Sequence, residues 1–264
     1  MEYTKRDSAP DKQHNDIVAG RNSVREAILS GRPIDSVMIA KGERQGSLHS
    51  IIQLAKQNGI PVREVAPIKL DSLCPGGHHQ GICASTAAHD YASVEDIFAL
   101  AESRGEPPFI ILADGIADPH NLGAIIRTAE AVGAHGVIVP KRRATGLTWT
   151  VGKASAGALE YIPVARVSNL AQCIDELKKR GVWICAADMD GESWCGANLS
   201  GAIGLVIGGE DGGVSRLVRE KCDFIISMPM FGRINSLNAS CACAVTLYEI
   251  ARQRHAIPAN NKFK

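Results

Sequence analysis

Three segments in the second half of the sequence place polar side chains where apolar runs end. The first is residues 118–129, with the sequence DPHNLGAIIRTA. Asn121 occupies the expected N-cap of a helix, and Arg127 falls roughly opposite the apolar stripe of that helix. Taken alone, the segment is typical of a capped helix whose exposed arginine pairs with Glu130. It becomes a candidate site only together with the other two segments.

The second segment, residues 203–215, is an apolar strand followed by a glycine-rich turn, IGLVIGGEDGGVS. Glycine lets a ligand approach the backbone, and the loops at the carboxyl ends of parallel strands are where α/β proteins bind ligands. The turn is not a P-loop, because no lysine follows Gly213, and the pattern GxGxxG does not fit it. We therefore expect a ligand site of another kind, in which Glu210 has a role. A tight turn before a helix is the plainer alternative.

The third segment follows the apolar strand 224–228 and carries RINSLNASC at residues 233–241. One serine or asparagine would suffice as a helix cap, whereas residues 235–240 contain two of each. Small polar side chains at this density, together with the free N–H groups of a helix start, can hold an adenine edge or an anionic group.

The order of the apolar runs predicts the scaffold that must position these loops. From residue 107 onward apolar strands alternate with amphipathic helices, which predicts an α/β fold with a parallel sheet covered on both faces. The expected strands are 109–113, 136–140, 161–165, 182–186, 203–208 and 224–228. The expected helices are 121–132, 150–159, 169–180 with Ser168 as its N-cap, 215–221 and 236–254.

A smaller unit precedes this domain. Helical stripes at 22–29 and 48–55 alternate with strands at 35–40, 61–65 and 80–85, which predicts a small αβα domain. Ser93, with Asp96 three residues later, indicates a helix start, and the run from Arg104 to Pro108 interrupts the chain. We place a flexible tail at 1–15, the small domain at 16–88, a linker at 89–106, the larger domain at 107–257 and a second tail at 258–264.

Composition excludes some classes of protein. Hydrophobic residues make up 45% of the 264 residues, enough for a core, and no run approaches the roughly 18 apolar residues of a membrane span. The net charge of +1 gives no general signature of a nucleic-acid binder. The eight cysteines form no CxxC pair and, with no secretion signal at the amino terminus, favour reduced thiols in a cytoplasmic protein. His78-His79 lacks a third ligand at suitable spacing, so we expect no metal.

Together the three segments resemble the SpoU/TrmH group of the SPOUT class of RNA 2'-O-ribose methyltransferases. The resemblance covers residues 107–257 and rests on NLGAIIRTA, IGGEDGG and MPM followed by SLNAS, in the family's order and spacing. The amino-terminal unit, with HQGI at residues 79–82, resembles the small L30e-like substrate-binding domain of many members. In that respect the chain is most similar to the branch that methylates a guanosine of large-subunit (23S-type) ribosomal RNA.

The resemblance implies a topology, a cofactor and an assembly. The carboxy-terminal segment is expected to thread a deep trefoil knot, a known exception to the rule that chains are unknotted, and to hold S-adenosylmethionine there. Members of the family are homodimers whose active sites are completed across the interface. Carried over residue by residue, the catalytic positions are Asn121, Arg127, Glu210, Ser236 and Asn238, and the cofactor-binding positions are Gly208, Met228, Leu237 and Ser240.

The implied reaction is an in-line attack of a ribose 2'-hydroxyl on the methyl group of a sulfonium. Because charge is neutralised as the reaction proceeds, the main task of the enzyme is to position the reactants. We expect Arg127 to grip the adjacent phosphate and stabilise the developing alkoxide, since a guanidinium does not readily give up its proton. Asn121 and Asn238 would orient the nucleophile and the cofactor loop, and Glu210 would fix Arg127 or the loop itself.

Two other functions stay open at this point. One is 2'-O-ribose methylation of transfer RNA rather than ribosomal RNA. The other is a non-catalytic RNA-binding or ribosome-assembly protein that keeps only the fold. The intact set of Asn121, Arg127, Glu210 and Asn238 argues against the second, because a protein that only binds RNA has no physical need for all four.

Overall fold

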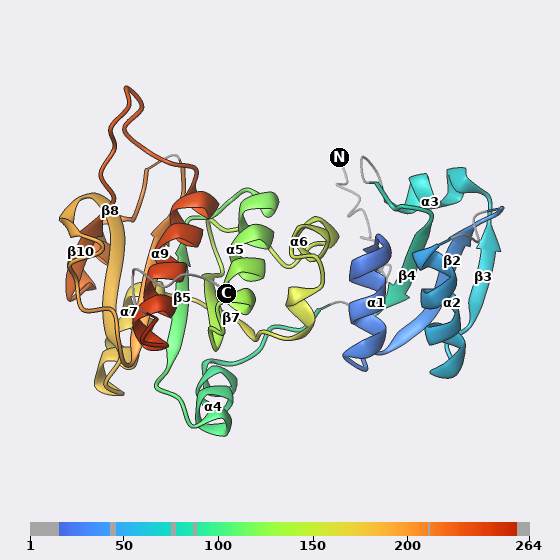
Figure 1. Ribbon diagram of the computed structural model, residues 1–264, viewed down its shortest axis with the longest axis horizontal. Coiled ribbons are helices and arrows are strands. Elements are labelled where there is room, and N and C mark those ends of the chain that lie inside the picture. Colours follow the sequence, from blue (N-terminus) through green and yellow to red (C-terminus); the bar gives the residue numbers. More distant parts are fainter. Residues whose placement is uncertain (1–15, 43–45, 75–77, 87–88, 211, 258–264) are drawn as a thin grey trace, which may run out of the picture.

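The computed structural model describes residues 16–42, 46–74, 78–86, 89–210 and 212–257. These residues form two units, each built on its own β-sheet (Figure 1). The tails expected at 1–15 and 258–264 lie outside the described residues. Within the described part of the chain, no helix is long and apolar enough to cross a membrane.

The amino-terminal unit is a four-stranded sheet of order β1-β4-β2-β3 in which only the β2–β3 pair is parallel. Its strands are β1 (Asp16–Ala19), β2 (Ile34–Ala40), β3 (Val62–Val65) and β4 (Ile82–Thr86). Its helices are α1 (Arg21–Leu29), α2 (Ser47–Gln57) and α3 (Pro67–Leu73). Alternate side chains of β2 serve two cores: Val37 packs with α1 and α2, whereas Met38 packs with Leu70 of α3.

Two elements of this unit were not predicted from the sequence, β1 and α3. The strand β1 has four residues, which is too short to show an alternating pattern. The helix α3 has one buried residue, Leu70, so it carries no apolar stripe; its start at Pro67 fits the proline preference for a first helical position.

The second unit is a six-stranded sheet of order β10-β8-β9-β5-β6-β7 with every neighbouring pair parallel. This confirms the predicted α/β fold with a parallel sheet. The strands are β5 (Phe109–Asp114), β6 (Gly136–Pro140), β7 (Val164–Val167), β8 (Trp183–Ser193), β9 (Ile203–Gly208) and β10 (Phe224–Ser227). The helices are α4 (Val94–Arg104), α5 (Pro119–Ala131), α6 (Trp149–Ala154), α7 (Leu170–Lys179), α8 (Arg216–Lys221) and α9 (Ala239–Arg254), with a 3-10 turn η1 (Ala158–Glu160).

Helices cover both faces of this sheet, as the continuous apolar strands predicted. On one face α5 and α9 pack side by side, burying Ile125 and Leu247 against the strands. On the other face α4, α7 and α8 contribute Ile97, Leu177 and Val218. Two apolar layers therefore hold the carboxyl ends of the strands in a fixed plane.

Residues 94–104 of the segment expected as a linker form the helix α4. Its start is the predicted one: the Ser93 hydroxyl accepts a hydrogen bond from the Asp96 backbone N–H, and the Asp96 carboxylate accepts one from the Ser93 N–H. Ile97 is fully buried over Gly136, where a Cβ atom would come within 2.4 Å of the isoleucine. This part of the connection thus packs against the larger sheet.

Candidate active site

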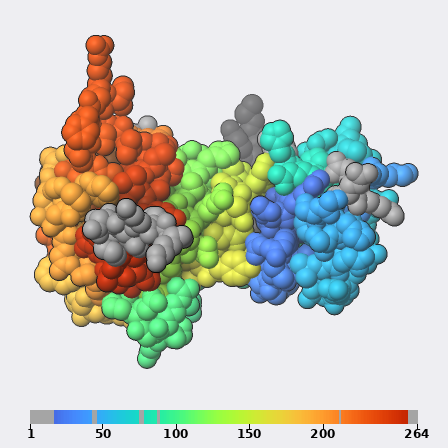
Figure 2. All heavy atoms as spheres, viewed as in Figure 1, coloured from blue at the N-terminus to red at the C-terminus, as the bar shows by residue number. Residues whose placement is uncertain are grey.

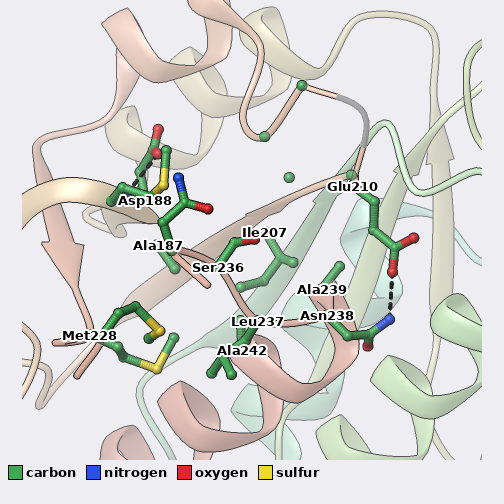
Figure 3. Close-up of a pocket in the computed structure, with 17 residues that line it drawn as sticks. Ala187, Asp188, Ile207, Glu210, Met228, Ser236, Leu237, Asn238, Ala239 and Ala242 are labelled. Atoms are coloured by element: carbon green, nitrogen blue, oxygen red, sulfur yellow. Dashed lines mark hydrogen bonds between the residues drawn. The ribbon is translucent and has the colours of Figure 1, made fainter. Parts of the chain in front are cut away.

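A cavity of about 700 Å³ opens at the carboxyl edge of the larger sheet (Figure 3). Its walls come from the middle of β8, the end of β9, the turn after β9, the segment between β10 and α9, and the first turn of α9. The structure brings six of the nine predicted site residues to it, namely Gly208, Glu210, Met228, Ser236, Leu237 and Asn238.

Three polar side chains from distant segments meet at one side of this cavity. The side-chain amide of Asn121 donates to the Glu210 carboxylate at 3.0 Å. The side-chain amide of Asn238 donates to the side-chain oxygen of Asn121, also at 3.0 Å. The Asn238 amide also donates to the same oxygen of Glu210 (Figure 3). This bond and the two bonds of Asn121 close a triangle. The triangle ties together α5, the turn after β9 and the start of α9.

The position of Asn121 differs from the expected helix N-cap. Asp118 caps α5 instead, with its carboxylate accepting from the His120 N–H at 3.0 Å, and Pro119 takes the first helical position. Asn121 therefore lies inside the first turn, where it is buried. Because its amide is not used for capping, it is free to bridge Glu210 and Asn238.

Asn238 has two roles at once. Its side-chain oxygen caps α9 by accepting from the Ser240 N–H at 3.0 Å and the Cys241 N–H at 3.3 Å, while its amide group faces the triangle. Ser240 does not line the cavity, and its hydroxyl donates to the same Asn238 oxygen at 2.6 Å. The helix begins at Ala239 rather than at the expected residue 236, which leaves 236–238 as non-helical cavity wall.

The first two glycines of the turn make backbone contacts that leave no room for side chains. A Cβ atom on Gly208 would lie 2.0 Å from the Gly213 carbonyl carbon, and one on Gly209 would lie 2.3 Å from the Gly115 oxygen. The Gly209 N–H donates to Asp114 O, and the Gly213 N–H donates to Gly209 O, each at 2.9 Å. The loops after β5 and β9 are therefore pressed together at the edge of the sheet.

Arg127 stands apart from the other predicted residues. It is exposed on α5, does not line the cavity and makes no hydrogen bond or ion pair with any described residue, including Glu130. The Glu210 carboxylate accepts hydrogen bonds from Asn121 and Asn238 and makes no contact with Arg127. An arginine without a partner on the surface is available for an anion from outside the chain.

Sequence reasoning missed the contribution of β8. Asp188 and Met189 line the cavity, and the Asp188 carboxylate pairs with Arg219 at 2.5 Å. The strand was expected to end at residue 186, whereas it continues to Ser193. An acidic residue directly after an apolar strand, on the edge that holds the other loops, is the signal that could have found it.

No cluster in the described residues has the composition of a metal centre, in that no three His, Cys, Asp or Glu side chains gather there. His79, one of the two adjacent histidines, pairs with Asp71 at 3.1 Å.

Comparison with known proteins gives matches over both units. The profile of the SpoU rRNA Methylase family matches residues 108–248, and that of the RNA 2'-O ribose methyltransferase substrate-binding domain matches residues 17–92. YacO of Bacillus subtilis, assigned to the TrmH family of tRNA/rRNA methyltransferases, is 46% identical over 246 residues, which cover 93% of this chain and 98% of YacO. A relative from Staphylococcus haemolyticus with the same assignment is 43% identical, over 92% of this chain and 98% of its own.

Among solved structures, the SpoU methyltransferase AviRb from Streptomyces viridochromogenes, in complex with the cofactor AdoMet, aligns with a TM-score of 0.75 and 26% identity. The alignment covers 91% of this chain and 90% of AviRb. One profile matches more than half of the chain, and a relative is 46% identical over nearly all of it. The chain that forms this cavity and its polar triangle therefore belongs to the SpoU rRNA Methylase family.

Proposed function

We propose that the protein is a cytoplasmic, homodimeric enzyme that methylates a ribose 2'-hydroxyl of RNA with S-adenosylmethionine as donor. The proposed substrate is a guanosine of large-subunit ribosomal RNA. The observation that carries this proposal is the meeting of Asn121, Glu210 and Asn238, from three remote segments, beside one cavity.

The residues of the cavity fit the proposed cofactor. S-adenosylmethionine combines an apolar-faced adenine with polar ribose and amino-acid groups, and it supplies a methyl group on an electrophilic sulfonium. The cavity offers apolar side chains from Met228 and Leu237, backbone at Gly208 and polar groups at Ser236 and Asp188. Its volume of about 700 Å³ lies within the range of roughly 300–1,000 Å³ of small-molecule sites. AviRb, which shares the fold, was solved with this cofactor.

The catalytic task left to the chain is to place and polarise the ribose hydroxyl. The triangle holds the Glu210 loop and the start of α9 in one arrangement, so both walls of the cavity are fixed before RNA binds. The Arg127 guanidinium supplies positive charge to the phosphate next to the target and to the developing alkoxide. No residue of the triangle needs to change its protonation for this role.

The homodimer explains why Arg127 lies outside the cavity of its own chain. The segment between β10 and α9 projects from the body of the molecule (Figure 2), and it exposes Phe231 and Ile234 to 95% and 74%. On α9, Tyr248 is exposed to 60%. Apolar surface of this kind is typical of a protein interface. We propose that a second copy covers it and that Arg127 completes the site of the partner.

The finer features of the fold are also proposals. We propose that the segment after β10 passes through a deep trefoil knot, supported by the contact of the Gly208–Gly213 turn with Gly115 and by the packing of α9 on α5. The domains are proposed as an L30e-like unit at 16–88 for RNA substrate, a connection at 89–106 and a SPOUT methyltransferase unit at 107–257.

Two observations support ribosomal RNA over transfer RNA. The matching profile for residues 108–248 describes an rRNA methylase, and a separate substrate-binding domain matches residues 17–92. Ribosomal RNA presents its target within a large folded structure, for which a second RNA-binding surface is an advantage. The relatives from Bacillus and Staphylococcus carry both RNA classes in their assignment, so transfer RNA is the second candidate.

The test is a map of ribose methylation over all cellular RNAs, in cells with and without this protein. We expect one 2'-O-methylguanosine of large-subunit RNA to disappear with the gene and to return with the wild-type chain. Loss of a transfer-RNA methylation instead would assign the second candidate. An unchanged map, with a ribosome-assembly defect, would refute the enzymatic function and favour the non-catalytic alternative.

A further inference from the structure

Two buried cysteines of the amino-terminal unit face each other beneath α3. Cys74 is the C-cap residue of α3 and Cys83 lies in β4, and their Sγ atoms are 3.2 Å apart. The two residues are exposed to only 1% and 0%. Elsewhere in the described chain, no two cysteine sulfur atoms lie within hydrogen-bonding distance.

The two sulfur atoms are chemically unequal. The hydrogen bond with Cys83 is the main cause that lowers the pKa of Cys74, and the positive charge of Lys153 on α6 lowers it further. Burial and the negative charge of Asp71 raise this pKa and offset part of the shift. For Cys83, the bond to Cys74 and burial raise the pKa. By contrast, burial raises the pKa of the solitary Cys173 to about 11. The two pKa shifts have opposite directions, so we assign the attacking role to Cys74 and the resolving role to Cys83.

A short movement would bring the two sulfur atoms to bonding distance. Bonded sulfur atoms are about 2.05 Å apart, so the observed separation must shrink by about 1.2 Å. Cys83 is fixed by strand pairing to β1 and β2. Cys74, at the end of a helix of seven residues, has no strand partner and can move without disturbing the sheet.

We propose that Cys74 and Cys83 form a site of reversible oxidation, at which a hydroperoxide converts the two thiols into a disulfide. The Cys74 thiolate attacks one peroxide oxygen and breaks the O–O bond, which gives a sulfenic acid and, with one proton, a water molecule. The Cys83 sulfur then attacks the Cys74 sulfur, and the second water leaves with the thiol proton. Two thiols and one hydrogen peroxide become one disulfide and two waters, and both electrons pass to the peroxide.

The disulfide would close a ring around a polar segment. Within it, His79 binds Asp71 of α3 at 3.1 Å, and Gln80 accepts from the backbone N–H and the Nε of Arg21 at 3.0 and 3.1 Å. Residues 78–81 form one wall of an open polar cavity of about 810 Å³. Oxidation would therefore hold this wall in place relative to α3 and β4.

The experiment uses the full-length chain, reduced and then exposed to hydrogen peroxide. Free thiols are alkylated under denaturing conditions, and disulfides are located by mass spectrometry of peptides. We expect a Cys74–Cys83 crosslink that forms before any other disulfide, disappears on treatment with dithiothreitol and raises the melting temperature of the oxidised protein.

Two variants control this result. Cys83→Ser removes the resolving thiol, so Cys74 should accumulate as sulfenic or sulfinic acid without a crosslink. Cys173→Ser removes a buried thiol of the other unit and should leave the Cys74–Cys83 crosslink unchanged. The proposal is overturned if both thiols stay alkylatable while the exposed Cys195 and Cys241 oxidise, or if Cys74 in Cys83→Ser is no more oxidised than Cys173.

Discussion

At the scale of single residues, Asn238 determines how the site is held together. One end of its side chain caps a helix and the other joins Asn121 to Glu210. The sequence motif singled out Asn238 and its neighbours as candidates, because small polar side chains exceeded the needs of capping. It did not predict that Asn121 lies inside the helix, because the Asp118-Pro119 start and an Asn121 cap look alike in sequence.

Asn238→Asp separates the two roles of this side chain. Aspartate caps helices as well as asparagine does, so we expect a small change in melting temperature. It cannot donate to Asn121 or Glu210 and adds a negative charge beside the Glu210 carboxylate, so methyl transfer should fall by at least ~10-fold. The measurement is turnover with labelled S-adenosylmethionine and ribosomal RNA.

The matched control is Asn169→Asp, at the N-cap of α7, where the side chain accepts from the Gln172 N–H at 3.1 Å. This variant should keep full activity. Equal activities of Asn238→Asp and Asn169→Asp would mean that the triangle does not contribute to catalysis.

At the scale of elements, the sequence predicted the six strands of the larger sheet and the helices between them, although not all of their bounds. The bounds that differed depend on tertiary contacts: β8 runs on to Ser193 because β10 pairs with its final residues. The cap of α7 is Asn169 rather than Ser168, a choice between neighbours that sequence pattern does not decide.

Gly208→Ala tests the close contact of the glycine turn. The added methyl group would lie 2.0 Å from the Gly213 carbonyl carbon, so the turn must open. We expect the affinity for S-adenosylmethionine, measured by calorimetry, to fall by at least ~10-fold, or about 1.4 kcal/mol.

Gly152→Ala is the control for this prediction, because a Cβ atom at Gly152 on α6 meets no atom within 4 Å and Gly152 does not line the cavity. It should bind the cofactor with wild-type affinity. If Gly208→Ala also binds normally, the turn does not shape the cofactor site.

His135 makes the stability of the larger sheet depend on pH. Its ring is fully buried, its Nδ1 accepts from the Phe109 N–H at 2.9 Å, and its Nε2 lies 3.2 Å from the Glu106 carboxylate. Burial lowers the pKa of His135, an effect that Glu106 only partly offsets. The unfolded chain therefore binds the proton more readily, and stability falls as the pH drops through the unfolded value of about 6.5.

We expect the melting temperature of the wild-type protein to fall as the pH is lowered from about 7.5 to about 5.5. The variant His135→Asn should be less stable than the wild type at the higher pH, but its melting temperature should depend less on pH. The exposed His49→Asn should keep the wild-type slope. A wild-type slope in His135→Asn would show that another group controls the transition.

At the scale of the whole molecule, a buried charge cluster joins the two units. Glu160 of η1 pairs with Arg32 at 3.0 Å and His89 at 3.1 Å, and the side chains of Glu160 and Arg32 are exposed to only 7% and 8%. Nearby, the Tyr161 hydroxyl donates to Glu26 of α1 at 2.6 Å. Pairing over more than 120 positions could not be predicted from the sequence, because neither Arg32 nor Glu160 stands in a motif.

Glu160→Gln should loosen this contact. It removes the buried negative charge that pairs with Arg32 and His89, and breaking a buried ion pair typically costs about 3–5 kcal/mol. We expect a lower melting temperature and a larger radius of gyration by small-angle X-ray scattering. The control Arg25→Gln removes an exposed ion pair with Glu26 and should change neither the melting temperature nor the radius of gyration. An unchanged radius of gyration in Glu160→Gln would show that the units are held by other contacts.

In the proposed function the cavity holds the methyl donor, while Arg127, outside the cavity, acts on the RNA. The most direct test is Arg127→Ala, measured for cofactor binding by calorimetry and for methyl transfer to ribosomal RNA with saturating S-adenosylmethionine. We predict unchanged affinity for the cofactor and a loss of transfer of at least ~100-fold. Wild-type transfer by a variant that binds the cofactor normally would contradict the account.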